Sequence, residues 1–319
     1  MDSVPDISVV IPVKNEARLI EDCLQGILNQ TVPVKEIIVI DSGSTDGTQE
    51  LVKKFDKTVL VEISSADFNH GTTRNLGVSK AKGEFVIMTV GDAVPSSQNW
   101  IEEMLRGFTA EDVAGVCGRQ IVPHDLDKNP IEWFRPVNPP QIREYQFTES
   151  EWKELSPEKV KEACSWDDVS AMYRKSSLSE IPFEKITYGE DGLWALSVLK
   201  KGFKLVYNES AQVYHYHLIN DEYMFKRSLT TMYFRYKYFK FIPTSIDSVI
   251  IRLARAVKVL WQSNEIGIRR KVYWLNYNLK IHRSLLRSRK LFMKALASGE
   301  EELDILHREY CGTPPIPSK

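Results

Sequence analysis

The sequence predicts an α/β protein with a mostly parallel sheet, helices on both of its faces, and a helical C-terminal region. Two observations predict this class. Short runs of β-branched residues alternate with helical patterns over residues 7–95, as in parallel sheets covered on both faces. Residues 222–297 contain seventeen Lys and Arg but three Asp and Glu, although the net charge of the whole chain is -1. We therefore place an α/β domain at residues 1–220 and a basic helical region at residues 221–319.

Each element follows from a local pattern. Apolar and β-branched runs predict strands at residues 7–13, 36–40, 58–63, 84–88, 112–122, 202–207 and 211–217. Apolar residues at helical spacing predict helices at residues 19–28, 49–55, 71–81 and directly after Asp191. Residues 123–162 are rich in Pro, aromatic and charged residues, so we expect an irregular stretch that holds an acceptor lid or loop.

The composition limits the class of protein. Of the 319 residues, 43% are hydrophobic and 27% are charged, which is ordinary for a folded, soluble protein. The four cysteines show no metal-ligand spacing and no disulfide pattern, so reduced thiols are the simple interpretation. The first residues lack the basic start and apolar run of a secretory signal, and no apolar run reaches the roughly 20 residues that span a bilayer. We expect a cytoplasmic protein.

Acidic residues follow three of the predicted strands. Glu16 comes after the first strand, Asp41 and Asp46 after the second, and Asp92 after the fourth. The carboxyl ends of parallel strands share one edge, where ligands bind in such sheets. The chain has no GxGxxG or GxxxxGK motif, so neither a dinucleotide nor a P-loop phosphate site is supported. Acids without a glycine cradle favour recognition of a ribose and base, with a divalent cation bridging a diphosphate.

Arg74 opens the helix after the third strand. Its planar donor fork suits phosphate oxygens, and a helix N-terminus adds backbone N–H donors. The simpler alternative is a surface arginine beside a capping threonine. Its place at the edge that carries the acids favours phosphate binding.

Glu190 and Asp191 lie between two glycines, directly before the apolar pattern that begins at Leu193 and Trp194. This places them at a junction between a loop and a helix. Carboxylates also favour helix N-termini, so capping is the alternative role. We predict that Asp191 is a catalytic base, which requires a carboxylate within reach of the hydroxyl that it deprotonates.

Two of the six histidines, His215 and His217, are two residues apart in the last predicted strand. Side chains at this spacing point to one side of a strand. A metal site and a purely structural role both remain open for the pair.

Six segments in sequence order resemble the family 2 inverting glycosyltransferases of the GT-A fold, and most closely bacterial rhamnosyltransferase-like members. The segments are residues 9–16, 40–48, 68–75, 91–95, 188–191 and 213–217. Each is weak alone, but six in order are specific to the family. The resemblance implies transfer of a sugar, rhamnose in those members, from a nucleotide-diphosphate donor to a hydroxyl of a cell-surface glycan or its lipid-linked precursor. It leaves both dTDP- and UDP-linked donors open.

The resemblance also implies roles for individual residues. The nucleotide and substrate contacts that it implies are Pro12, Val13, Asn15, Glu16, Asp41, Ser42, Asp46, Arg74, Gly91, Asp92, Glu190 and Trp194. It makes Asp191 the base, and Asp92 and His217 ligands of Mg or Mn. Val90 replaces the first acid of the family's Asp-x-Asp motif. Weaker metal affinity follows, and strict metal dependence is in doubt.

The basic C-terminal region suits an anionic membrane surface, because its helical pattern mixes Trp and Tyr with Lys and Arg. We expect peripheral attachment at the inner face of the plasma membrane. Packing on the catalytic domain and homo-oligomer formation are the alternatives, while no nucleic-acid-binding motif is present. A competing hypothesis, motivated by Val90, is a non-catalytic nucleotide-sugar-binding or assembly protein. The Glu190–Asp191 pair argues against it, since a binding protein needs no base.

Overall fold

The computed structural model describes residues 5–136, 139–243 and 246–312. The chain forms two compact units, which we describe separately. The first consists of residues 1–121 and 136–215, and the second of residues 122–135 and 216–319. Residues 122–135 therefore group with the C-terminal helices, although they lie far from them in the sequence.

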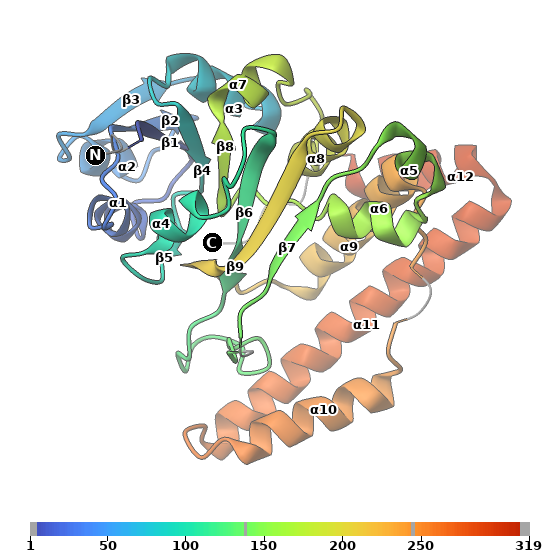
Figure 1. The fold of residues 1–319 in the computed structure, drawn as a ribbon. Coiled ribbons are helices and arrows are strands. Elements are labelled where there is room, and N and C mark those ends of the chain that lie inside the picture. Colours follow the sequence, from blue (N-terminus) through green and yellow to red (C-terminus); the bar gives the residue numbers. More distant parts are fainter. Residues whose placement is uncertain (1–4, 137–138, 244–245, 313–319) are drawn as a thin grey trace. The chain divides into compact units, whose positions relative to one another are not determined.

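The first unit contains a nine-stranded sheet (Figure 1). Its parallel half consists of β3 (Thr58–Glu62), β2 (Glu36–Asp41), β1 (Ile7–Val13) and β4 (Phe85–Met88). Its mixed half consists of β8 (Ala171–Arg174), β6 (Val113–Ile121), β9 (Lys204–Tyr214), β5 (Val94–Pro95) and β7 (Ile142–Tyr145). Strand β8 runs antiparallel to both β4 and β6. The predicted α/β class is confirmed, and the reversed strand β8 proves important for the site.

Helices cover both faces of this sheet. On one face, α1 (Ile20–Leu28), α2 (Thr48–Val52) and α4 (Trp100–Leu105) share one apolar core with Val9 and Ile11 of β1. On the other face lies α3 (His70–Lys80). A Cβ on Gly77 of α3 would overlap Val10, so this glycine allows the helix to rest directly on the strand. The helices α7 (Lys175–Glu180) and α8 (Glu190–Lys200) also belong to this unit.

The prediction that residues 123–162 are irregular was wrong for part of the segment. It contains β7 and two short helices, α5 (Glu149–Glu154) and α6 (Pro157–Ala163). Thr148 forms a capping box with Glu151, and Ser156 caps α6 with Pro157 in its first turn. These capping signals are local and outweigh the polar composition of the segment.

The two strands predicted at residues 202–207 and 211–217 are one strand, β9. The polar residues between them stay in the sheet because buried Asn208 donates from Nδ2 to the Glu103 carbonyl oxygen at 2.8 Å, and a register shift against β6 absorbs the irregularity. Strand β9 ends at Tyr214. His215 and His217 therefore lie beyond it, and the prediction that they share a strand face was wrong.

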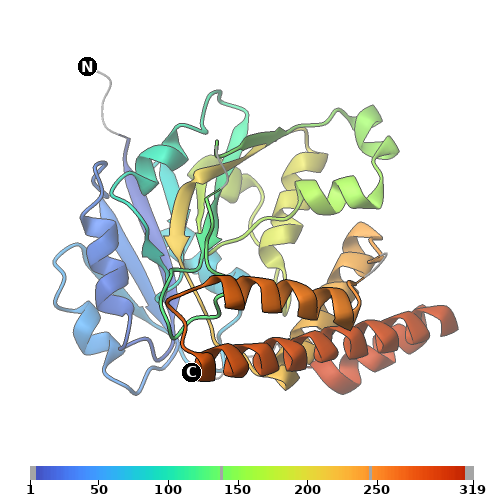
Figure 2. The same cartoon turned by 90° about the horizontal axis from the view of Figure 1, so that it is seen from below.

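The described residues of the second unit form four helices, which confirms the helical C-terminal region. They are α9 (Asp221–Phe239), α10 (Val249–Gln262), α11 (Ile268–Ser298) and α12 (Glu300–Cys311). Phe225, Phe292 and Leu303 form one apolar core between α9, α11 and α12. Helix α10 lies alongside α11, and Figure 2 shows the pair from below. Within the described ranges, none of the helices is both long enough and apolar enough to cross a membrane.

Candidate active site

The structure brings the predicted nucleotide contacts to one edge of the sheet. Strands β1, β2 and β4 are parallel, so Val13, Asp41 and Gly91 lie at or directly after neighbouring carboxyl ends. Ser42 joins two of these ends, because its backbone N–H and its hydroxyl both donate to the Val13 carbonyl oxygen, at 3.0 and 3.1 Å. Pro12 belongs to the same end of β1.

The loops after β1 and β2 are held together by side-chain hydrogen bonds. Asn15 adopts a left-handed conformation (φ 56°) and accepts from the Thr45 N–H at 2.8 Å. One oxygen of Asp46 accepts from the Ala17 N–H at 3.0 Å, and the other accepts from the Thr48 hydroxyl at 2.6 Å. Asp46 therefore closes the loop, and hydrogen bonds within the loops already engage both of its oxygens.

Asp41 is fully buried, and one of its two carboxylate oxygens lacks a hydrogen-bond partner within the described ranges. Its Oδ1 accepts from the Gly43 and Ser44 N–H groups at 2.9 Å and from Gln49 Nε2 at 2.8 Å. Its Oδ2 is buried and has no hydrogen-bond partner among the residues that the structure describes. Burial alone raises the pKa of this carboxyl, but the hydrogen bonds outweigh burial and hold the pKa below its usual value. Asp41 thus presents an ionised acceptor without a partner.

Two carboxylates that were not predicted as site residues, Asp167 and Asp168, join this edge. They precede β8, which pairs antiparallel with β4 and matches Ala171 with Met88. The start of β8 therefore lies beside the end of β4, where the Thr89 hydroxyl donates to the Val169 carbonyl oxygen at 2.9 Å. The available signal was a pair of adjacent acids directly before a short apolar segment.

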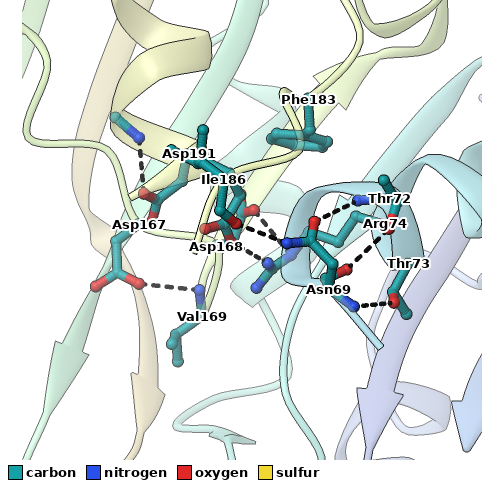
Figure 3. A network of polar contacts seen from close by, with 12 residues as sticks. Asn69, Thr72, Thr73, Arg74, Asp167, Asp168, Val169, Phe183, Ile186 and Asp191 are labelled. Carbon is teal, nitrogen blue, oxygen red and sulfur yellow. Dashed lines mark hydrogen bonds and ion pairs between the residues drawn. The ribbon is translucent and has the colours of Figure 1, made fainter. Parts of the chain in front are cut away.

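Arg74 lies at the centre of a buried charge network (Figure 3). Only 5% of the residue is exposed; its Nε lies 2.9 Å from Asp168 Oδ2, and its Nη1 donates to Glu190. Asp168 also accepts from the Tyr173 hydroxyl, which in turn accepts from Trp166 Nε1 at 2.6 Å. Two carboxylates thus occupy the donor fork. This geometry favours a role in positioning the acids, whereas phosphate binding by Arg74 stays a prediction.

The polar side chains on either side of Arg74 hold a neighbouring loop in place. Asn69 Nδ2 donates to the Ile186 carbonyl oxygen at 2.7 Å (Figure 3). The amide of Asn75 donates to the Phe183 carbonyl oxygen at 2.8 Å and accepts from the Phe183 N–H at 3.0 Å. The first turns of α3 therefore hold the loop that leads to the acidic pair.

Gly71 makes this contact possible. A Cβ at this position would overlap the carbonyl oxygen of Glu184, a backbone atom that has no room to move aside. Only glycine lets α3 and the loop approach this closely.

Glu190 and Asp191 form the first turn of α8, as predicted. The N-cap residue is Gly189 (φ 79°), and no side chain caps the helix, so neither acid serves as its N-cap. Asp191 Oδ1 accepts from the adjacent Gly192 N–H at 2.7 Å. Trp194 is 2% exposed and donates from Nε1 to the Ile181 carbonyl oxygen at 2.9 Å, which leaves little of its side chain for a ligand.

The charges around Asp191 set its proton affinity. Burial is the largest cause that raises the pKa of Asp191 well above that of an ordinary aspartate. The negative charges of Glu190, Asp168 and Asp167 raise this pKa further, while Arg74 acts in the opposite direction. Part of the Asp191 residue remains exposed, so the residue lies at the border between the interior and the surface.

A chain of polar contacts connects Asp92 to the acidic cluster. Asp92 Oδ1 lies 3.5 Å from His215 Nε2, and His215 Nδ1 lies 2.6 Å from Gln120 Oε1. Gln120 Nε2 donates to Asp167, so its carbonyl oxygen faces the histidine. Nδ1 therefore carries a proton, and Nε2 faces the Asp92 carboxylate. The sequence placed both histidines among the candidates and favoured His217 as the ligand; His217 lies two residues later, in the second unit.

The Val90 side chain offers no polar atom in place of the first acid of the Asp-x-Asp motif. Its side chain packs against the apolar core of the first unit, and its carbonyl oxygen accepts a contact from the Cys23 thiol at 3.5 Å. The first unit thus offers a cation Asp92 and His215, a carboxylate and an imidazole, which fit Mg or Mn.

Comparison with known proteins decides the family. The family described as Glycosyl transferase family 2 matches residues 8–181, which is more than half of the chain. The chain belongs to this family. This family 2 glycosyltransferase is 31% identical over 228 residues to the O-antigen chain rhamnosyltransferase RfbN of Salmonella typhimurium, covering 70% of this chain and 71% of that protein. It is 30% identical over 243 residues to WbaN of Salmonella anatum, which has the same descriptive name, covering 72% and 71%.

Solved structures agree on the fold of this glycosyltransferase. The mannosyltransferase PcManGT from Pyrobaculum calidifontis, solved with GDP-Man and Mn²⁺, superposes with a TM-score of 0.51 at 18% identity and covers 96% of this chain and 79% of that one. Residues 1–349 of TarS from S. aureus give a TM-score of 0.53 at 16% identity, covering 95% and 78%. These similarities confirm the GT-A fold. With the family match, they support a transferase over the non-catalytic alternative.

Proposed function

We propose that this glycosyltransferase transfers a sugar, with inversion, from a nucleotide-diphosphate donor to a hydroxyl of a cell-surface glycan or its lipid-linked precursor. One observation carries the proposal: the partly exposed Asp191, with its raised pKa, lies at the sheet edge that also carries the unpartnered oxygen of Asp41. Because RfbN and WbaN are named as O-antigen chain rhamnosyltransferases, rhamnose is the first sugar to test.

The proposed reaction is a single displacement. The acceptor oxygen forms a bond to the anomeric carbon while Asp191 takes the hydroxyl proton, because a sugar hydroxyl is a poor nucleophile at neutral pH. The bond between that carbon and the donor phosphate oxygen breaks, and the nucleoside diphosphate leaves with both bonding electrons. Attack opposite to the leaving group inverts the anomeric centre. Glu190, paired with Arg74, positions the base.

The nucleotide would bind at the ends of β1 and β2. A pyrimidine base carries an imide N–H, a donor that suits the free Oδ2 of Asp41. Pro12, Val13, Asn15, Glu16 and Ser42 surround that edge and are the proposed further contacts, with Gly91 beneath them. A Cβ on Gly91 would crowd Val13 and Glu16, so this glycine keeps the edge compact.

A divalent cation would bind at Asp92. The position of His215 supports this proposal, since Gln120 holds the ring so that Nε2 lies 3.5 Å from the Asp92 carboxylate, where both groups are placed to share a cation. His217 remains a predicted ligand. When bound, Mg or Mn would neutralise the negative charge that develops on the departing diphosphate.

Nucleotide titration tests the proposed donor site. Calorimetric titration of the protein with dTDP and UDP, each with and without Mn, is expected to show metal-enhanced binding, and a preference for dTDP would support rhamnosyl transfer. Asp41→Asn removes the ionised acceptor, so it is expected to weaken binding about tenfold or more. The exposed Asp56→Asn serves as the matched control. If neither nucleotide binds, the proposal fails at the donor site.

Asp92→Ala tests the cation site. Loss of the carboxylate is expected to weaken nucleotide binding chiefly in the presence of Mg or Mn, because the lost contact acts through the cation. Titrations with metal and with chelator measure the difference. Equal weakening under both conditions would remove Asp92 from the metal site.

Location at the inner face of the plasma membrane and formation of a homo-oligomer are also proposals. The basic helices of the second unit support membrane attachment through their charge.

A further inference from the structure

Helix α10 has three distinct faces. Ala256 and Leu260 are buried and attach the helix to the rest of the second unit. A second face, from which Ile250, Val257 and Trp261 project, is apolar but exposed. A third face carries cations. An ordinary surface helix has an apolar face toward the core and a polar face toward solvent, so a second apolar face is unexplained by the packing of α10.

The exposed apolar face is continuous. Ile250, Leu253, Val257 and Trp261 recur at intervals of three and four residues, which places them in one row along the helix. The exposed fractions are 79% for Ile250 and 47% for Trp261. The first turns of α11 add Ile268 and other exposed apolar side chains. Contiguous apolar surface of this kind marks an interaction site.

The cations of α10 and of the first turns of α11 form few ion pairs. Residues 249–273 contain six Lys and Arg and one acid, Glu265. Within the described part of the chain, Arg255 pairs with Asp247, whereas Arg252, Lys258, Arg269 and Arg270 have no carboxylate within ion-pair distance. Lys271 Nζ instead lies 5.8 Å from the centre of the Trp261 ring, which ties the start of α11 to the exposed row.

A cavity of about 310 Å³ opens on the basic flank of α10. Arg252, Arg255, Lys258, Gln262 and Asn278 line it, together with the apolar residues Ile131, Ala256 and Val259. Three cations thus open onto one cavity, which lies on a different side of α10 from the exposed apolar row.

We propose that the α10–α11 face, defined as residues 250–261 of α10 and 268–273 of α11, docks onto an anionic phospholipid bilayer. The proposal deepens the proposed function, on which it rests for the expectation of a lipid-linked acceptor. Tryptophan, aliphatic side chains and flanking Lys and Arg form the pattern of an interfacial helix. The face attaches to the surface and does not cross it.

Charge favours a bilayer over a second copy of the chain. A symmetric dimer through this face would bring two sets of like cations together, because both partners present the same surface. An anionic bilayer offers the opposite charge to every one of them, and each Lys or Arg near such a surface adds attraction.

Vesicle sedimentation of the full chain tests the proposal. The protein is expected to bind phosphatidylglycerol-containing vesicles, to bind phosphatidylcholine vesicles much more weakly, and to lose binding as salt rises. The charge variant Arg269→Glu/Arg270→Glu and the apolar variant Ile250→Ser/Trp261→Ser are each expected to reduce partitioning about tenfold or more. Thermal unfolding confirms that each variant is folded.

Matched substitutions in the first unit serve as controls. Ile142→Ser removes an exposed aliphatic side chain (59% exposed), and Lys53→Glu/Lys80→Glu reverses two exposed charges. Both are expected to bind vesicles like the unaltered protein. Unchanged binding by the two face variants, or absence of binding by the unaltered protein, would overturn the proposal. So would a fall in oligomer mass in the apolar variant without any vesicle binding, which would make this face an interface between copies.

The vesicle assay needs no turnover and no nucleotide. A protein that binds anionic vesicles but transfers no sugar would contradict the proposed function alone. A protein that transfers sugar to a soluble acceptor but does not bind anionic vesicles would contradict the docking proposal alone.

Discussion

Asp191→Asn is expected to lower the rate of sugar transfer by about a hundredfold to ten-thousandfold, while dTDP or UDP binding stays within about twofold. The amide keeps the shape of the side chain but cannot accept the hydroxyl proton. Donor binding should persist because the proposed nucleotide contacts lie at the ends of β1 and β2. Transfer assays with dTDP-rhamnose, paired with calorimetric titration, measure both quantities.

Glu184→Gln is the matched control, because this exposed acid belongs to the loop before α8 and contributes only its carbonyl oxygen to the contact with α3. Its turnover should equal that of the unaltered enzyme. If Asp191→Asn also turned over normally, Asp191 would not be the base.

The pH profile gives a second test of Asp191. Its raised pKa means that the carboxyl stays protonated at pH values where an ordinary aspartate is ionised. Since a base must be ionised, the transfer rate should rise with pH through this raised value, and the acidic limb should lie above the usual aspartate range. A limb at about pH 4 would contradict the environment described here.

Arg74→Met is expected to destabilise the protein by about 3–5 kcal/mol, because it leaves Asp168 and Glu190 as buried charges without a cation. Urea unfolding measures the loss. Burial already raises the pKa of Asp168 to about 6 against the opposing effect of Arg74, and removal of the arginine would raise it further. Carboxyls with raised folded pKa values lose stability as pH rises through those values. The destabilisation should therefore be larger at pH 8 than at pH 5.

The same substitution should move the acidic limb of the transfer rate to higher pH, since Arg74 lowers the pKa of Asp191. Loss of folding alone would reduce activity without moving this limb. Arg74→Lys keeps the positive charge and should hold the limb close to its original position. If Arg74→Lys instead weakened dTDP binding and left stability intact, the arginine would bind phosphate, and the positioning role would be wrong.

The alternation of strands and helices was predictable because buried parallel strands are continuous apolar runs that local pattern reveals. Residues at the carboxyl ends of β1, β2 and β4 were predictable for the same reason, since parallel strands end at one edge. Strand β8 was harder. It has four residues, and its antiparallel pairing with β4 depends on contacts more than eighty residues apart in the chain. Asp168 was missed with it.

Arg74 illustrates a different limit. Its residue type and its place in α3 were predicted, but the direction of its side chain was not, because a helix N-terminus presents residues both to solvent and to the interior. Two buried acids from distant segments, Asp168 and Glu190, decide that direction. The direction of the His215 side chain was not predictable for the same reason, because its partner Gln120 belongs to the distant strand β6.

The attachment of α3 to residues 183–186 has a consequence for the timing of catalysis. Hydrogen bonds from Asn69 and Asn75 order this loop along its backbone when the protein folds. The conformational entropy of the loop is therefore lost once, during folding, and not again at each turnover. Asp191 therefore keeps one position between turnovers. Binding of the acceptor has only to bring its hydroxyl to a base that is already oriented.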